Sequence, residues 1–442
     1  MSRFEVHSHT EYSNIRLLDC INKPKDLILA AAEMGLVGIA ITDHECLSSH
    51  IKVEHIKEEI KEKYPDFKVA LGNEIYLTPD RSKGQVYYHF ILIAKDEVGH
   101  KQLRQLSSIA WLNSYTDRGM ERVPTTYEDI ERIIGAAPGH VVATTACIGG
   151  QLGYSIRQME EAERFGRAAA KKEWHESIVD FILWCKDIFG DNFYIECAPG
   201  CSEEQIAVNK RTRAIANAFD VKMVVGSDAH YLRKEDRYVH KSYLTSNEKN
   251  GKEREVDAFY EYSYLQTPEE EIEHLAQSDF EEEFVKEMWE NSIEISNKIF
   301  DYNLFHKQSI PSVPVEYYPP VEAHDEKHPI LSSLLGSEDK YDRYWINQCL
   351  ESLKEKGLDK DPAYLDRLEE EADIKKVVSE KLETNMFKYP VTLQHYINLF
   401  WECGSTVGAG RGSACSGLNH YLLGVTQLDP IKWELPFWRL EL

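Results

Sequence analysis

Short apolar runs alternate with helix-forming stretches from Arg3 to about His240. The strand-like runs are residues 4–6, 37–42, 69–73, 141–145, 193–196 and 222–226. The stretches expected to be helical are residues 27–34, 51–63, 97–115 and 203–219. Repeated alternation of strand and helix predicts a parallel sheet or barrel. Because about seven strands are expected in all, we favour a closed β/α barrel over an open sheet.

The remainder of the chain is expected to be mainly helical. Residues 247–257 are charged and contain glycine, which indicates a loop or boundary. Thr267 and Glu270 can form a capping box at the start of a helical pattern that continues through Phe300. Residues 309–328 are rich in proline and tyrosine, which predicts an extended connector. Further helices are predicted over residues 341–356, 364–382 and 395–403.

The length of 442 residues exceeds what one core supports and indicates two or three domains. The expected division is residues 1–265 and 266–442. The 51 basic and 75 acidic residues give a net charge of −24, which argues against a surface that wraps a nucleic-acid backbone by itself. Nine cysteines without a compact framework fit reduced thiols in a cytoplasmic protein. We find no apolar run long enough to cross a bilayer.

Side chains that bind metal ions follow several predicted strands directly. They are His7 and His9, Asp43 and His44, Glu74, Cys147, and Asp228 and His230. The carboxyl ends of parallel strands meet on one face, so these residues can converge in one pocket. Zinc and manganese select imidazole, carboxylate and thiolate ligands. Two or three such ions a few ångströms apart would favour phosphoester hydrolysis.

Each of these residues also has a plainer interpretation. Any one of the 17 histidines is more often a hydrogen-bonded core or surface residue than a ligand. Asp19 could be a turn residue, and His89 lies within an apolar strand, where it could simply pack. We interpret Asp43 as a residue that orients a ligating imidazole. Glu196 also ends a strand, but we take it as structural. The joint pattern, rather than any single residue, predicts the metal site.

Four motifs resemble those of the polymerase-and-histidinol-phosphatase (PHP) domain. They are Val6-His7-Ser8-His9-Thr10, Ile41-Thr42-Asp43-His44, Gly72-Asn73-Glu74 and Ser227-Asp228-Ala229-His230. The resemblance implies a distorted seven-stranded β/α barrel with three divalent metal ions, zinc or manganese. The implied metal ligands are His7, His9, Asp19, His44, Glu74, His89, Cys147, Asp228 and His230. With a cysteine at position 147, the chain resembles the polymerase-attached members of the family more than the free-standing phosphatases.

Residues 408–413 form a glycine-rich turn that contains Arg411 and Ser413. Glycines let a backbone approach phosphate oxygens, and arginine adds a charge-assisted fork. A plain loop between helices is the alternative. Residues 421–426, 428–430 and 435–439 follow the turn in order and change that interpretation. Together with the turn, they resemble the start of the palm in bacterial (C-family) DNA polymerase III alpha subunits. By this resemblance the incoming triphosphate would contact Arg411, Gly412, Ser413 and Arg439.

Two departures from that family pattern affect the turn. Ala409 stands where proline is usual, and residues 414–417 replace a more glycine-rich run. The turn is therefore expected to be slightly altered while it keeps its phosphate-binding role. In the family, the magnesium-binding aspartates of the palm follow the segment that matches Arg439. The chain ends at Leu442, so we expect a fragment or one part of a polymerase encoded in pieces.

The resemblance implies the first portion of a replicative DNA polymerase. Its complete form would use primer-template DNA, deoxynucleoside triphosphates and magnesium, together with the remaining polymerase part or replisome subunits, and no membrane. The PHP site is expected to be a 3′–5′ proofreading exonuclease. Its expected catalytic residues are His7, His9, Asp43, His44, Glu74, Asp228 and His230. Two alternatives stay open: a free-standing phosphoesterase of a small phosphomonoester, and a structural module without catalysis.

Overall fold

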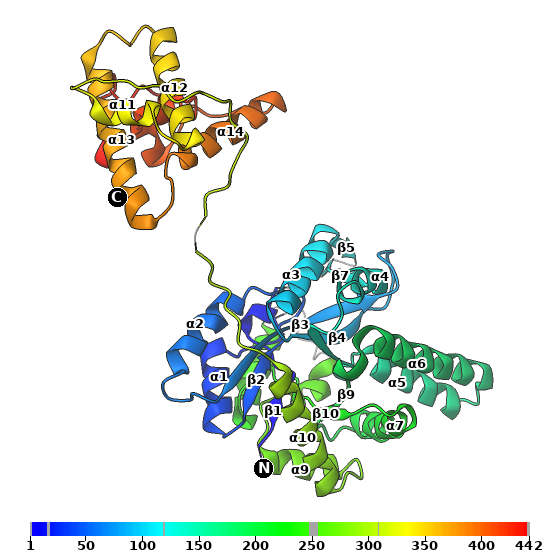
Figure 1. Cartoon of the computed structure of the whole chain (residues 1–442). Helices are drawn as coiled ribbons and strands as arrows, with labels where there is room; N and C mark the ends of the chain where they lie inside the picture. Colours follow the sequence, from blue (N-terminus) through cyan, green and yellow to red (C-terminus); the bar gives the residue numbers. More distant parts are fainter. Residues whose placement is uncertain (1, 16–17, 118–119, 247–254, 308, 440–442) are drawn as a thin grey trace. The chain divides into compact units, whose positions relative to one another are not determined.

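The computed structural model describes residues 2–15, 18–117, 120–246, 255–307 and 309–439. The chain forms two compact units, Met1–Phe305 and His306–Leu442. Figure 1 shows strands surrounded by helices in the first unit and a group of packed helices in the second. In these ranges we find no helix that combines the length and the apolar character needed to cross a membrane.

Eight strands of the first unit form one sheet. They are β1 Phe4–Glu5, β2 Gly38–Ile41, β3 Lys68–Thr78, β4 Tyr88–Ala94, β7 Pro124–Thr126, β8 Val141–Thr144, β9 Phe193–Cys197 and β10 Met223–Val225. Seven follow the order β1-β2-β3-β4-β8-β9-β10, and β7 pairs with β3. The ends of this path meet where Ser8 bridges Ala229 and the His9 amide donates to the Ala229 carbonyl at 3.1 Å. The predicted distorted seven-stranded β/α barrel is therefore confirmed.

Strand β4 runs against the direction of the other strands on this path. It is antiparallel to both β3 and β8, whereas the remaining neighbours are parallel. Only residues 79–87 separate β3 from β4. A connection of this length cannot hold the crossover of a dozen or more residues that a parallel neighbour requires. The parallel arrangement predicted from the alternation is thus interrupted, and β4 begins at the face where the parallel strands end.

The interior of the barrel is filled by side chains from every strand of the path. The strand members of this cluster are Phe4, Ala40, Ala70, Ile91, Ile93, Val142, Tyr194 and Val224. Successive side chains of a strand point to opposite faces. Accordingly, Ile39, Ile41 and Leu71 belong to a second cluster, together with apolar residues of the neighbouring helices. The barrel is a packed core, so a site can form only at its rim.

Helices lie around the outside of the barrel (Figure 1). They are α1 Pro24–Glu33, α2 His50–Ile60, α3 Glu97–Leu112, α4 Tyr127–Ile130, α5 Gln151–Arg164, α6 Ala168–Phe189, α7 Glu203–Phe219 and α8 Arg237–Thr245. The helix predicted over residues 203–219 coincides with α7. The helix predicted over 97–115 ends at Leu112, because β5 Tyr115–Asp117 and β6 Met120–Arg122 form a separate hairpin.

Two further helices, α9 Pro268–Ala276 and α10 Glu282–Lys298, belong to the barrel unit. The capping box predicted at the start of α9 is present. The Ser292 hydroxyl of α10 accepts a hydrogen bond from the Phe4 amide at 3.0 Å, and Asn291 donates to the Met223 carbonyl at 2.9 Å. These contacts bind α10 to β1 and β10. The first unit therefore extends well past the boundary expected at residue 265. The loop expected at 247–257 lies largely outside the described residues.

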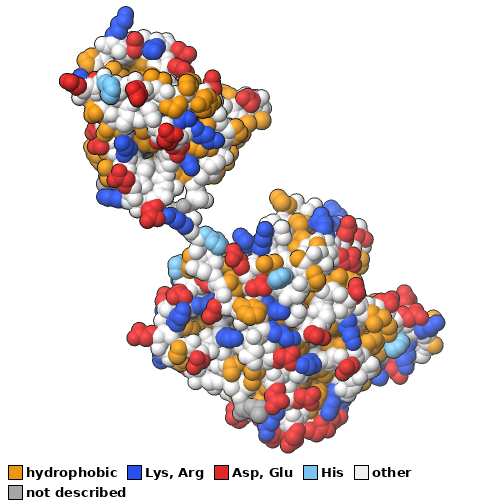
Figure 2. Space-filling model, viewed as in Figure 1, with side chains coloured by type: hydrophobic (Ala, Val, Ile, Leu, Met, Phe, Trp, Pro, Cys, Tyr) orange, Lys and Arg blue, Asp and Glu red, His pale blue; other side chains and the backbone are white. Residues whose placement is uncertain are grey.

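The second unit contains α11 Pro329–Leu335, α12 Lys340–Glu355, α13 Pro362–Leu382, α14 Lys388–Glu402 and α15 Leu418–Leu422. Its core includes the buried side chains of Trp345, Leu368, Phe387 and Leu418. Residues 309–328 hold no helix or strand, as expected of a connector. Figure 2 shows basic and acidic side chains interspersed over the visible face of each unit.

A Gly38→Ala substitution is expected to destabilise the barrel unit by about 3 kcal/mol. A Cβ atom at Gly38 would lie 2.2 Å from the Lys68 carbonyl oxygen and 2.9 Å from the Phe4 ring, so the pairing of β2 with β3 would have to shift. Urea denaturation measures the loss. Gly135→Ala is the control, because its Cβ would meet only the Ile188 side chain at 3.5 Å. Equal free energies of unfolding for the two variants would contradict this prediction.

Candidate metal centre

All nine side chains predicted as metal ligands lie at the same rim of the barrel. His7 and His9 follow β1, His44 follows β2, Cys147 follows β8, and Asp228 and His230 follow β10. Glu74 lies inside β3 rather than at its end. His89 is the second residue of β4, and the reversed direction of that strand brings it to this rim. Asp19 lies in the loop between η1 Glu11–Ser13 and α1.

The first group of donors consists of His7, His9, Glu74 and Asp228, all buried. The Nε2 atom of His7 lies 2.9 Å from Glu74 Oε2 and 3.2 Å from Asp228 Oδ1. The Nε2 atom of His9 lies 3.0 Å and 3.1 Å from the same two oxygens. Four ligands placed ~2.1 Å from a tetrahedral zinc ion would be ~3.4 Å apart. The spacing is therefore close to that of a metal site.

Two further groups share residues with the first. His9, His44 and His230 form one, with the His9 and His44 rings stacked at 4.1 Å between centroids. Asp19 lies beside it, with Oδ2 3.7 Å from the Nε2 atom of His44. Glu74, His89 and Cys147 form the other group. Glu74 is ion-paired with His89, and the Cys147 sulfur lies 3.6 Å from His89 Nδ1. His9 and Glu74 each belong to two groups, so the three groups form one cluster.

Glu196, which the sequence led us to treat as structural, orients a member of this cluster. Its Oε1 atom accepts a hydrogen bond from His7 Nδ1 at 2.6 Å, and its Oε2 atom accepts one from the Thr144 hydroxyl at 2.5 Å. A carboxylate behind a ligating imidazole fixes the ring and its tautomer. The position of Glu196 at the end of β9 was the available sequence signal.

Asp43, predicted to be catalytic, lies behind the cluster. Its carboxylate accepts hydrogen bonds from the backbone and hydroxyl of Thr10 and from the hydroxyls of Ser13 and Ser49, at 2.5–2.9 Å. The Ser13 oxygen lies 3.1 Å from His9 Nδ1. Asp43 therefore acts on His9 through Ser13 rather than by direct contact. Its role as a residue that orients a ligating imidazole stays a prediction.

Burial and nearby carboxylates shift the pKa values of three clustered histidines in different directions. Burial lowers the pKa of His7, but the carboxylates of Glu196, Asp228 and Glu74 outweigh it and raise that pKa well above its usual value. Burial is likewise outweighed at His9, whose hydrogen bonds to Asp228 and Glu74 raise its pKa to about 9. Burial lowers the pKa of His230 to about 3. A metal ion would therefore displace a proton from His9 but none from His230.

The donor set fits divalent metal ions. Within the described part of the chain, the Nε2 atom of His230 is buried without a hydrogen-bond partner, while its Nδ1 atom lies 2.8 Å from the Asp228 carbonyl oxygen. A buried ring nitrogen without a partner is costly unless it binds something. Imidazole, carboxylate and one thiolate match zinc or manganese better than calcium or magnesium, which take mostly oxygen ligands.

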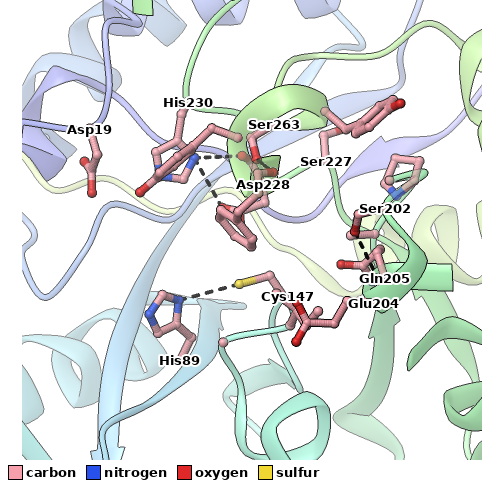
Figure 3. Close-up of a pocket in the computed structure, with 18 of the residues that line it drawn as sticks. Asp19, His89, Cys147, Ser202, Glu204, Gln205, Ser227, Asp228, His230 and Ser263 are labelled. Carbon is pink, nitrogen blue, oxygen red and sulfur yellow. Dashed lines mark hydrogen bonds and ion pairs between the residues drawn. The ribbon is translucent and has the colours of Figure 1, made fainter. Parts of the chain in front are cut away.

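The cluster opens into a cavity of about 430 Å³. Six of the nine donors line it: Asp19, His44, His89, Cys147, Asp228 and His230. Figure 3 shows Asp19, His89 and His230 on one side and Ser202, Glu204 and Gln205, at the start of α7, on the other. Cavities of ~300–1,000 Å³ are typical of small-ligand sites. The arrangement can present a phosphate ester to bound metal ions. The residues of the far wall were missed from the sequence because their approach depends on the packing of α7.

A Glu196→Gln substitution is expected to weaken zinc affinity about 10-fold to 100-fold. Glutamine keeps the shape of the side chain but removes the charge that holds the Nδ1 proton of His7. Competition with a zinc-binding dye measures the affinity. Glu176→Gln, at an exposed position of α6, is the matched control. The same affinity in both variants would show that Glu196 does not act through His7.

The residues predicted to bind a triphosphate lie in the second unit. Arg411, Gly412 and Ser413 are exposed at the start of η6 Gly412–Ser416. Gly412 has a φ of +63°, which glycine adopts without strain. The side chain of Arg439, at the end of η7 Phe437–Arg439, lies outside the described residues. The structure thus places three of the four residues side by side on an exposed turn.

Comparison with known proteins gives two family matches. The model described as the PHP domain matches residues 5–199, and that described as the bacterial DNA polymerase III alpha NTPase domain matches residues 343–440. The probable DNA polymerase YorL of Bacillus subtilis (strain 168) is 39% identical over 98% of this chain and 35% of its own length. The DNA-directed DNA polymerase of Bacillus phage SPbeta gives the same values.

A more distant relative is the DNA polymerase III subunit alpha of Campylobacter jejuni, 27% identical over 99% of this chain and 35% of its own length. The chain thus spans about a third of the length of these relatives. The chain thus combines a segment that matches the PHP domain with one that matches the bacterial DNA polymerase III alpha NTPase domain, and over nearly its whole length it is similar to bacterial DNA polymerases, DNA polymerase III alpha subunits among them.

Proposed function

We propose that the PHP domain binds two or three divalent metal ions, zinc or manganese, through the nine predicted ligands. The observation that carries this proposal is the overlap of three donor groups, in each of which the ligand atoms lie within 4.8 Å of one another. The groups contain all predicted ligands except Asp19, which lies 3.7 Å from His44. Such overlap is expected of neighbouring ions that share ligands.

We further propose that this site hydrolyses phosphodiesters at the 3′ end of a DNA strand. Bound divalent ions would supply hydroxide and neutralise charge on the phosphate. The chain's own residues hold the donors in place: Glu196 fixes the His7 ring, and Asp43 acts on His9 through Ser13. The strand end would lie in the cavity of about 430 Å³ beside the donors. The kinship with DNA polymerases supports DNA as the substrate.

For the protein as a whole we propose a role in DNA synthesis. The turn at Arg411, Gly412 and Ser413, together with Arg439, would bind the incoming deoxynucleoside triphosphate. Polymerisation would also need magnesium, primer-template DNA and the palm aspartates. Its partners would be the remaining polymerase part or other replisome subunits, and its location the cytoplasm. The support is the similarity to DNA polymerases over 98% of this chain.

The proposal is tested by incubating the full chain with manganese and a 5′-labelled single-stranded primer. Stepwise loss of 3′ nucleotides that stops on chelation is the expected result. Turnover of histidinol phosphate, with none on DNA ends, would instead favour a small-molecule phosphoesterase. If chelation lowers the melting temperature while no substrate is ever hydrolysed, the PHP domain is a structural module.

A further inference from the structure

Arg157 is the one lysine or arginine among the described residues that line the cavity beside the donor groups. It lies in the second turn of α5, the helix that follows the loop of Cys147. Its guanidinium donates hydrogen bonds to Glu204 at 3.0 Å and to the Ile148 carbonyl at 3.4 Å. Its Nε atom is buried without a hydrogen-bond partner in the described part of the chain. The guanidinium is thus held at the cavity wall by two hydrogen bonds, while its Nε–H donor makes none within the described residues.

The existing partner of Arg157 is easily exchanged. The side chains of Arg157 and Glu204 are 31% and 58% exposed, and ion pairs so open to water contribute little to stability. Phosphate offers arginine a two-pronged, charge-assisted contact that is stronger than a solvated carboxylate pair. An incoming phosphate can therefore replace Glu204 without disturbing the fold.

Aromatic side chains line the same cavity. Phe259, Tyr260 and Tyr262 contribute to its wall and are half-buried. The Tyr260 ring lies 5.0 Å from the His230 ring, edge to face, so this aromatic surface begins beside the donor cluster. Nucleic-acid bases stack on such surfaces with little regard to sequence. The cavity therefore offers metal donors, an aromatic surface and a single cationic group.

We propose that Arg157 selects polynucleotide substrates by binding the phosphate next to the one that is cleaved. The aromatic residues hold the penultimate nucleotide, which joins that phosphate to the phosphate cleaved at the donor cluster. This inference rests on the proposed function, because it assumes that a phosphodiester is cleaved at the cluster. A small phosphomonoester has no second phosphate and would gain nothing from Arg157. Arg157 is thus a specificity-determining residue rather than a catalytic one.

Binding of a fluorescein-labelled oligothymidylate to the full chain, measured with a chelator present to prevent cleavage, gives the first test. Arg157→Gln is expected to weaken binding about tenfold. It should also make the plot of log affinity against log salt shallower by about 0.7, the value for one lost phosphate contact on a single strand. Glu204→Gln should tighten binding about twofold, because it frees Arg157. Arg164→Gln, at an exposed position of the same helix, is the control.

Hydrolysis gives the second test. Arg157→Gln should lower kcat/KM about tenfold on the oligothymidylate but leave it unchanged on the p-nitrophenyl ester of thymidine 5′-monophosphate, which has one phosphate. The inference is overturned if Arg157→Gln and the wild-type chain show the same salt dependence of binding and the same ratio of kcat/KM values on the two substrates. Arg157 would then be a structural residue. If the wild-type chain hydrolyses neither substrate, the proposed function fails, and the binding series alone decides the role of Arg157.

Discussion

Replacing His9 with alanine is expected to lower manganese-dependent removal of 3′ nucleotides about a thousandfold. His9 belongs to two of the three donor groups, and its Nε2 atom lies 3.0 Å and 3.1 Å from carboxylate oxygens of Glu74 and Asp228. Losing it would disturb both groups at once. Metal ions supply several kcal/mol of charge stabilisation in such reactions, and about 4 kcal/mol corresponds to a factor of a thousand in rate.

The control for this variant is His175→Ala, the same change at an exposed position of α6, outside the cluster. Its rate should equal that of the wild-type chain. Single-turnover hydrolysis of a 5′-labelled primer measures both variants, and bound metal is counted by atomic emission. A His9→Ala protein that keeps the wild-type rate would place the activity somewhere other than this cluster.

Removal of bound metal is expected to lower the melting temperature of the barrel unit by about 10 °C. An ion present at about a thousand times its dissociation constant stabilises the folded state by about 4 kcal/mol. For a unit of this size, each kcal/mol shifts the melting temperature by about 2–4 °C. Scanning calorimetry before and after chelation, and after zinc is restored, measures the change. The helical unit, which contributes none of the nine donors, serves as the internal control.

The increase in melting temperature that bound metal produces should become larger as the pH rises from 7 to 9. In the metal-free protein, the pKa of His9 is raised to about 9, above its unfolded value near 6.5. The stabilisation from that proton is complete below about pH 6.5 and is lost as the pH rises through 9. Metal binding requires this proton to leave His9, so the metal affinity increases between pH 7 and pH 9. A stabilisation by metal that falls between pH 7 and 9 would contradict this account.

The sequence alone pointed to the closed barrel and to the donors at its rim. Both follow from local order: apolar strand runs recur between helical stretches, and polar donors such as His7, His44 and Asp228 come directly after them. Because parallel strands end on one face, a position just after a strand is enough to predict convergence. The structure brings all nine side chains to one rim. Their role as metal ligands stays a prediction.

Only the tertiary structure decided how those donors are held and what surrounds them. The reversal of β4 places His89 at the rim, and it depends on a connection too short for a crossover rather than on the residues of the strand. The hydrogen bond from His7 to Glu196 joins residues 189 positions apart. Arg157 reaches the cavity because α5 and α7 pack beside it. Sequence patterns report neighbours along the chain, whereas these contacts arise from the closure of the barrel.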